Sequence, residues 1–200
     1  MWNFVTFFGD SSFTVPAALL LVVWLCYNTS WRMAFIWASC YCLTMLAVVL
    51  SKLLFMGWQI APPGLNFTGM SGHSASAMAL LPVAALLLTP AQGTLRTCCV
   101  SAAILLALAV GYSRLPLGAH SPSEIVTGLT IGLTGAGLFI IWLLRRPPAV
   151  PLRRRGVAAL LLLGLFFATD FKPAPTQDLL GQVAQVLSGR AQPYTRLAPL

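Results

Sequence analysis

The sequence predicts an all-α protein, an integral membrane bundle of about six transmembrane helices. Apolar residues make up 58% of the 200 residues, and charged residues make up only 8%. An ordinary soluble domain carries about 25% charged residues, and a single soluble core could not bury this much apolar surface. The apolar runs are continuous rather than alternating, which favours helices over the strands of a membrane barrel.

Six apolar stretches are candidate membrane spans. A transmembrane helix needs about 20 apolar residues at about 1.5 Å each. The predicted spans are residues 13–27, 33–57, 72–89, 95–112, 124–144 and 157–171, of which the first and the last are the shortest. We therefore expect one membrane domain over residues 1–171 and a C-terminal tail over residues 172–200.

Two stretches outside the predicted spans suit a membrane surface. Residues 2–8 are rich in aromatic side chains and are expected to lie at the outer interface. The N-terminus lacks the positive segment of a signal peptide, so the first apolar segment is expected to be retained. In the tail, residues 177–187 are weakly amphipathic, and both a short surface helix and a disordered end remain open.

The arginines predict how the chain is oriented in the membrane. The loops between spans one and two, three and four, and five and six lie on one side and hold one, one and five arginines. By the positive-inside rule this side is cytoplasmic. The loops after spans two and four, and both termini, then face outward, which in a bacterial inner membrane is the periplasm.

The net charge of +8 does not indicate a nucleic-acid partner. Five of the twelve basic residues lie between Arg145 and Arg155, and no basic–aromatic surface pattern accompanies them. A loop that faces anionic lipid explains them better. The five cysteines all fall inside apolar runs, where thiols serve as small packing residues. Since no Cys/His cluster has ligand spacing, no metal or other cofactor is expected.

Polar residues gather on the predicted outward side. Such residues are costly in a membrane protein and tend to be functional. Lys52 ends span two, and His73 opens span three. Arg114 follows span four, and His120 and Glu124 open span five. The two histidines of the chain therefore share one membrane face with two cations and a carboxylate.

This group of residues has the chemistry of phosphoryl transfer through a phosphohistidine. Ser71 and Gly72 sit at a predicted helix start, where free backbone N–H groups favour an anion. His120 and Glu124 are four residues apart, so a carboxylate can hold one ring nitrogen and leave the other as a nucleophile. His73 is then free to protonate the leaving oxygen. Lys52 and Arg114 add positive charge for the phosphate.

Two stretches resemble motifs of the type 2 phosphatidic acid phosphatase (PAP2) family. Residues 71–77, Ser-Gly-His-Ser-Ala-Ser-Ala, resemble the second motif, which is usually Pro-Ser-Gly-His. Residues 113–124, Ser-Arg-Leu-Pro-Leu-Gly-Ala-His-Ser-Pro-Ser-Glu, resemble the third motif, which is Ser-Arg, five residues, His, three residues, Asp. The resemblance covers about residues 5–140. The related soluble vanadium haloperoxidases share this type of site, but the number of spans favours the membrane branch.

The resemblance implies roles for particular residues. It makes His120 the nucleophile, His73 the general acid, and Arg114 with Ser71 and Gly72 the phosphate cradle, with no metal. The first family motif is Lys, six residues, Arg-Pro, whereas here Lys52 is followed by Gln59-Ile60. Losing one charge-assisted hydrogen bond costs about 1.5–3 kcal/mol, although the Gln59 amide can still donate to a phosphate.

Two further departures from the family pattern change no chemical group. Met70 replaces the usual proline before Ser71 and loosens a turn. Glu124 replaces the usual Asp, and its longer arm can still reach His120.

Structural roles remain open for several of these residues. Lys52 could extend from a span end to the interface, and Arg114 could be an interfacial anchor. Residues 121–124, Ser-Pro-Ser-Glu, also fit a capping box, in which Glu124 would serve the backbone rather than His120.

The leading functional hypothesis is a membrane lipid phosphatase. Its substrate would be phosphatidic acid, a polyprenyl diphosphate, phosphatidylglycerol phosphate or a lipid A phosphate. The alternatives are a lipid phosphotransferase that uses the same histidine, and a non-catalytic lipid-binding protein of the same fold. A small transporter is a weaker alternative, because it predicts broken helices near the bilayer middle. The sequence leaves the oligomeric state open.

Overall fold

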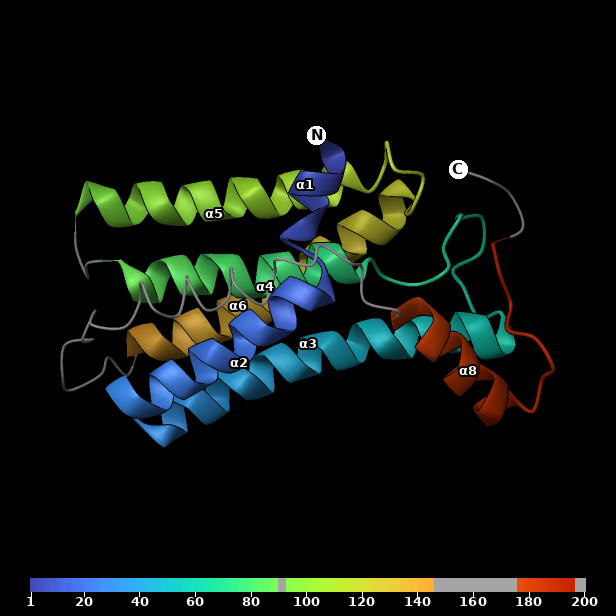
Figure 1. Ribbon diagram of the computed structural model, residues 1–200, viewed down its shortest axis with the longest axis horizontal. Coiled ribbons are helices and arrows are strands. Elements are labelled where there is room, and N and C mark those ends of the chain that lie inside the picture. Colours follow the sequence, from blue (N-terminus) through green and yellow to red (C-terminus); the bar gives the residue numbers. More distant parts are fainter. Residues whose placement is uncertain (90–92, 146–175, 197–200) are drawn as a thin grey trace.

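The structure is a computed structural model that describes residues 1–89, 93–145 and 176–196, and these residues contain helices and no strand. Figure 1 shows a bundle of roughly parallel and antiparallel helices along the long axis of the molecule. In chain order the helices are α1 (Trp2–Phe7), α2 (Ser11–Asn28), α3 (Trp31–Trp58), α4 (Gly72–Leu88), α5 (Thr94–Ser113), α6 (Pro122–Arg145) and α8 (Thr176–Ser188).

The predicted fold class is confirmed. The first five predicted spans correspond to α2, α3, α4, α5 and α6, each within a few residues at either end. The aromatic N-terminal stretch forms α1. Of the two alternatives for the amphipathic tail stretch, a short helix and a disordered end, the structure has the helix, α8. The sixth predicted span, residues 157–171, and most of the arginine cluster lie outside the described residues.

The helices have the length and surface of membrane spans. Four stretches, Trp2–Asn28, Trp31–Trp58, Thr94–Ser113 and Pro122–Arg145, are long and apolar enough to cross a bilayer. Their outer faces expose large apolar side chains, such as Leu43 and Leu105, which are each 65% exposed. An apolar surface of this extent would be costly in water and suits lipid. The chain is therefore a membrane protein.

Helix α4 is shorter and lies in the middle of the bundle, packed against α5, α6, α3 and α2. Its N-terminal half includes four small buried residues, Ser74 to Ala77, which let neighbouring helices approach closely. The start of α6 lies so close that a Cβ atom at Gly128 would come 2.6 Å from the carbonyl oxygen of Ser71. The Ser71 N–H donates to the Glu124 carbonyl at 2.9 Å, which joins the starts of the two helices.

The two ends of the bundle differ in composition. One core cluster of α2, α3, α4 and α6 is built from large apolar side chains, including Trp24, Trp37 and Phe139. At the other end, on the right in Figure 1, lie the α3–α4 loop, the α5–α6 loop and α8, with α1 beside the end of α5. The loops after α3 and α5 thus share one end, as the alternation of the spans predicts.

Candidate functional site

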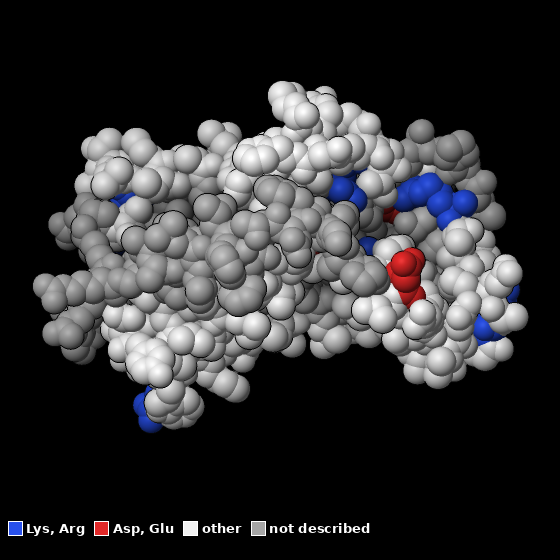
Figure 2. Space-filling view, in the orientation of Figure 1, with Lys and Arg blue, Asp and Glu red and all other residues white. Residues whose placement is uncertain are grey.

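A cavity of about 1010 Å³ opens at the loop-bearing end of the bundle and is lined by residues of α1, α2, α3, α4, both loops and the C-terminal segment. Five of the predicted site residues line it: Lys52, Gly72, His73, Arg114 and His120. Figure 2 shows basic side chains gathered around a hollow on this part of the surface. The structure therefore brings both histidines and both predicted cations to a single cavity.

The other three predicted residues do not line this cavity. Glu124 is fully buried behind His120. Ser71 is also fully buried, and its hydroxyl caps α4 by accepting from the Ser74 N–H at 3.4 Å. Gln59 ends α3 with a left-handed backbone (φ 57°) and lines a separate cavity of about 350 Å³. The structure does not bring Gln59 to the histidines.

His120 is held by the carboxylate of Glu124. Its Nδ1 atom lies 2.8 Å from Oε2 of Glu124, which is in the first turn of α6. A carboxylate on Nδ1 fixes the tautomer of the ring and leaves Nε2 for chemistry. His120 precedes α6 by two residues, and the chain at the helix start brings its ring to the carboxylate four positions later.

Glu124 also caps the helix that carries it. Its Oε2 accepts from the Ser121 N–H at 3.0 Å, while Ser121 Oγ accepts from the Glu124 N–H at 3.4 Å. This is the reciprocal capping box that the sequence predicts as an alternative. Thr68 donates to Oε1 through its N–H at 2.5 Å and its hydroxyl at 2.8 Å. One carboxylate therefore serves the backbone and His120 at the same time.

The loop after α5 folds back so that Arg114 and His120 are neighbours. The Arg114 carbonyl accepts from the N–H groups of Ala119 at 3.1 Å and His120 at 3.4 Å. Arg114 Nη1 donates to Thr6 Oγ1 of α1 at 2.8 Å. Its Nε atom is buried and has no hydrogen-bond partner among the described residues. Arg114 also lines the cavity, so its guanidinium adds positive charge there.

His73 pairs with a carboxylate that the sequence analysis did not single out. Its Nε2 atom lies 3.2 Å from Asp10 Oδ2, at the start of α2. The turn before α2 packs closely against the start of α4 here. A Cβ atom at Gly9 would lie only 2.7 Å from the His73 carbonyl oxygen. Ser76 Oγ of α4 also joins these two segments by donating to the Gly9 carbonyl at 2.9 Å. The cavity therefore holds two histidine–carboxylate pairs.

The start of α4 adds neutral donors to the cavity. Gly72 and His73 are the first two residues of α4 and both line the cavity. The first N–H groups of a helix have no partner within it and, together with the helix dipole, favour an anion. Ser71 uses its side chain on the Ser74 N–H, so the two amides before Ser74 are those that can serve a ligand.

Lys52 reaches the cavity from the last turns of α3. Its Nζ atom donates to Gln177 Oε1 of α8 at 2.9 Å. Met70 N–H donates to Ser51 Oγ at 3.0 Å, which holds the α3–α4 loop against the same part of α3. The lysine thus points into the protein rather than only toward a membrane interface.

Burial sets the electrostatics of the loop residues. Burial lowers the pKa of His120 below its ordinary value, while the hydrogen bond to Glu124 opposes this shift. Burial also lowers the pKa of the Arg114 guanidinium, against the attraction of Asp10. A lowered pKa keeps the His120 ring neutral, which is the nucleophilic form.

The described residues contain no group of three or more His, Cys, Asp or Glu side chains placed to hold a metal ion. The expectation that the site needs no cofactor remains a prediction. The residues that could hold a ligand here are the donors of the cavity, and together they suit a phosphate group.

Five residues that contact the site were not predicted from the sequence: Asp10, Thr6, Thr68, Gln177 and Arg196. Of these, Asp10 could have been identified as a candidate from the sequence. The chain has only four acidic residues and two histidines, so each acidic residue next to a predicted span is a candidate histidine partner. The others contribute through contacts between distant segments, which no local pattern indicates.

The comparisons with known proteins agree with the motifs. The family model described as PAP2 superfamily matches residues 56–148, which include His73, Arg114 and His120. A relative from Klebsiella pneumoniae is 39% identical over 199 residues, covering 98% of this chain and 95% of the relative, and is described as an uncharacterized 22.5 kDa protein in the cps region. No solved structure matches the chain. The PAP2 superfamily generally comprises phosphatases, which supports a phosphatase-type activity, and the chain belongs to this superfamily.

Proposed function

We propose that the protein is a membrane lipid phosphatase that removes phosphate from a lipid phosphate or diphosphate through a phosphohistidine on His120. The observation that carries the proposal is the single cavity that joins two carboxylate-paired histidines with Lys52 and Arg114. Phosphoryl transfer depends on positioning and on positive charge around the moving phosphoryl group. A nucleophile, a proton donor and two cations meet both needs.

The first step transfers the phosphoryl group to His120. Because Nδ1 faces Glu124, the Nε2 lone pair attacks phosphorus, and the bond from phosphorus to the lipid oxygen breaks. The leaving oxygen takes a proton from the His73 imidazolium, whose charge the Asp10 carboxylate stabilises. Lys52, Arg114 and the α4 amides stabilise the negative phosphoryl oxygens.

The second step releases phosphate. Water attacks the phosphorus of the phosphohistidine, and neutral His73 accepts a proton from this water. The N–P bond breaks, its electrons return to His120 Nε2, and inorganic phosphate leaves. Both histidines are then in their starting protonation states.

The walls of the cavity favour a lipid as the substrate. Beyond the polar residues, the lining includes the apolar side chains of Phe4, Phe7, Val15, Met45 and Val49. Val15 and Phe4 are also 47% and 62% exposed. An accessible apolar wall suits acyl or prenyl chains, while the phosphate occupies the polar end.

The arginine distribution supports an inner-membrane protein whose site faces the periplasm. In this proposal residues 1–171 form the PAP2-like membrane domain and residues 172–200 the tail. The partners are the lipid phosphate and the bilayer, with no nucleic acid.

The test is phosphate release by the purified full-length protein in detergent from phosphatidic acid, a polyprenyl diphosphate, phosphatidylglycerol phosphate and lipid A phosphate. We expect release from at least one of these lipids and a loss of about 10⁴-fold or more in His120→Ala, because the covalent route is removed. The control is Arg32→Gln, which removes an exposed charge at the far end of α3. Equal release by wild type and His120→Ala would rule out the mechanism. Labelled phosphate appearing on a second lipid instead of in water would identify a phosphotransferase.

A further inference from the structure

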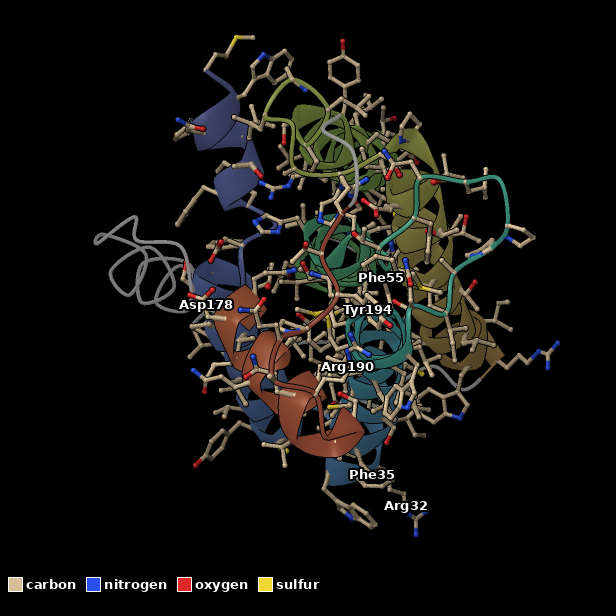
Figure 3. All side chains as sticks on the ribbon, turned by 90° about the vertical axis from the view of Figure 1, so that its right-hand side faces the viewer. Arg32, Phe35, Phe55, Asp178, Arg190 and Tyr194 are labelled. Atoms are coloured by element: carbon tan, nitrogen blue, oxygen red, sulfur yellow. The ribbon has the colours of Figure 1, made fainter. Side chains whose placement is uncertain are left out.

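The C-terminal part of the chain packs onto the end of α3 that bears the site. Ala184 of α8 is fully buried against Phe55 and Met56 of α3. Gln177, in the first turn of α8, accepts from Lys52 inside the cavity. Figure 3 shows α8 lying across this end of the molecule, in front of α3. The tail is therefore in contact with the site from its first helical turn.

After α8 the chain returns toward the cavity as an extended segment, residues 189–196, which we call the C-terminal arm. Three contacts fix its course. Gln185 Nε2 donates to the Ala191 carbonyl at 3.0 Å, and the Tyr194 N–H donates to the Met56 carbonyl at 2.8 Å. The Arg190 guanidinium lies 4.1 Å from the centre of the Tyr194 ring. Figure 3 shows Tyr194 next to Phe55 at this crossing.

The arm ends with Arg196 on the buried carboxylate of the site. Its Nη2 atom lies 2.8 Å from both Glu124 oxygens and 3.2 Å from Thr68 Oγ1. Its Nη1 atom donates to Asn66 Oδ1 at 2.5 Å. The ion pair is shielded from water, because the Arg196 side chain is 18% exposed and that of Glu124 is 0% exposed.

Arg196 is linked to the proposed nucleophile through one residue. Glu124 Oε2 contacts Arg196 on one side and His120 Nδ1 on the other, each at 2.8 Å. Arg196 also lines the same cavity as His120, together with Lys52 and Arg114. Gln59, in contrast, is a neutral side chain that lines only the second cavity, which Arg196 also borders. The tail thus adds to the site a cation that α3 and its following loop do not supply.

We propose that the C-terminal arm is a working part of this site and that Arg196 is a positioning residue for His120, acting through Glu124. The proposal rests on the phosphatase function proposed above. A guanidinium on both oxygens holds a carboxylate in one orientation and keeps it ionised. The Glu124 orientation in turn fixes the His120 ring, so that Nε2 is directed into the cavity.

If the arm only held the fold together, the Arg196 variant would also lose activity, so a second measurement is needed. The charged and titratable groups around His120 are Glu124, Lys52, Arg114, His73, Asp10 and Arg196. Glu124 and Asp10 favour the imidazolium, and the cations oppose it. Removing the Arg196 charge leaves the Glu124 carboxylate uncompensated beside His120. The pKa of His120 should therefore rise.

The experiment compares Arg196→Gln with Arg32→Gln in the full-length protein. Both changes remove one arginine charge, but Arg32 is exposed at the far end of α3, away from the arm and the cavity. The chain has two histidines, so ring-labelled histidine gives two NMR signals, which His73→Asn assigns. In parallel, kcat and KM for phosphate release are measured on the best lipid substrate.

We expect Arg196→Gln to move the His120 titration upward by about half a pH unit or more. Its kcat should fall about tenfold or more, as for the loss of one charge-assisted hydrogen bond, with a smaller change in KM. Arg196→Lys should restore the titration but only part of kcat, because one ammonium lacks the second nitrogen with which Arg196 also holds Asn66. Arg32→Gln should match wild type in both measurements.

Two results would overturn the proposal. One is wild-type titration and kcat in Arg196→Gln. The other is a fall in kcat with an unchanged His120 titration, which would show that the arm has only a structural role. If wild type releases no phosphate, the phosphatase function fails separately, and the titration alone decides whether Arg196 acts on His120.

Discussion

The two histidine–carboxylate pairs of the cavity are built in opposite ways. His120 just before α6 and Glu124 in its first turn are four residues apart in the chain, and their side chains are 2.8 Å apart. His73 and Asp10 come from α4 and the start of α2, and their atoms are 3.2 Å apart. The first pair depends on local helix geometry, whereas the second exists only because α2 and α4 pack closely at Gly9.

The pairs also differ in their access to solvent. The side chains of His120 and Glu124 are 10% and 0% exposed, and those of His73 and Asp10 are 23% and 10% exposed. A nucleophile gains from a fixed ring orientation, and a proton donor must exchange its proton in each cycle. The shielded pair, His120 and Glu124, therefore suits covalent attack, and the more exposed pair, His73 and Asp10, suits proton transfer.

The largest effect that separates the two pairs is expected for His73→Ala on a substrate with a poor leaving group. Losing the proton donor should lower kcat/KM for an alkyl lipid phosphate by about 10²–10⁴-fold. A nitrophenyl phosphate needs little protonation, so its loss should be much smaller. The measurement is kcat/KM on both esters, and equal losses on both would remove the proton-donor role from His73.

Glu124→Gln should cost somewhat less, about 100-fold in kcat. The amide keeps the length of the side chain and can still accept from Ser121, but it cannot carry the charge that pairs with His120 and Arg196. Leaving Arg196 without its partner adds to the cost. The control is Asp178→Asn, an acidic side chain exposed on α8, as Figure 3 shows. Wild-type kcat in Glu124→Gln would show that His120 needs no carboxylate.

Asp10→Asn should have a smaller effect, about tenfold in kcat. Asn is as good an N-cap as Asp, so the cap on the Ser12 N–H is kept and folding should not change. The loss should again depend on the leaving group, because Asp10 acts through His73. Asp178→Asn is the matched control, and a loss that is the same for alkyl and nitrophenyl esters would place Asp10 outside proton transfer.

The smallest expected effect is a shift of the pH profile. Since burial lowers the pKa of His120, the neutral ring persists to lower pH, and the acid limb of kcat/KM should lie below the ordinary histidine value of about 6.5. Glu124→Gln should move the limb further down, because the carboxylate that favours the imidazolium is gone. A limb at or above the ordinary value in wild type would contradict a buried, neutral nucleophile.

The sequence predicted the parts of the molecule that local patterns control. Continuous apolar runs located α2 to α6, and Ser71 and Ser121 marked the starts of α4 and α6. The spacing of His120 and Glu124 predicted their contact, and the capping box was also correct. These features depend on neighbours a few residues away, where helix geometry fixes the outcome.

The remaining features depend on contacts between distant segments. Asp10 reaches His73 only through the packing of α2 on α4, and Arg196 reaches Glu124 only because Tyr194 turns the arm across α3. Gln59 was predicted to bind phosphate from motif position alone, but the left-handed turn that ends α3 leaves it in another cavity. Its role as a phosphate ligand remains a prediction that the geometry does not favour.

The most direct test of the proposed roles, His120 as nucleophile and His73 as proton donor, is to identify the phosphorylated residue. The protein is mixed with a nitrophenyl phosphate or a labelled lipid phosphate, quenched in base within the first turnover, digested and analysed by mass spectrometry. We predict an acid-labile phosphoryl group on His120. With the nitrophenyl phosphate its occupancy should be higher in His73→Ala, where hydrolysis is slowed more than phosphorylation. A phosphoryl group on His73, or turnover with no phosphorylated residue in either protein, would contradict the account.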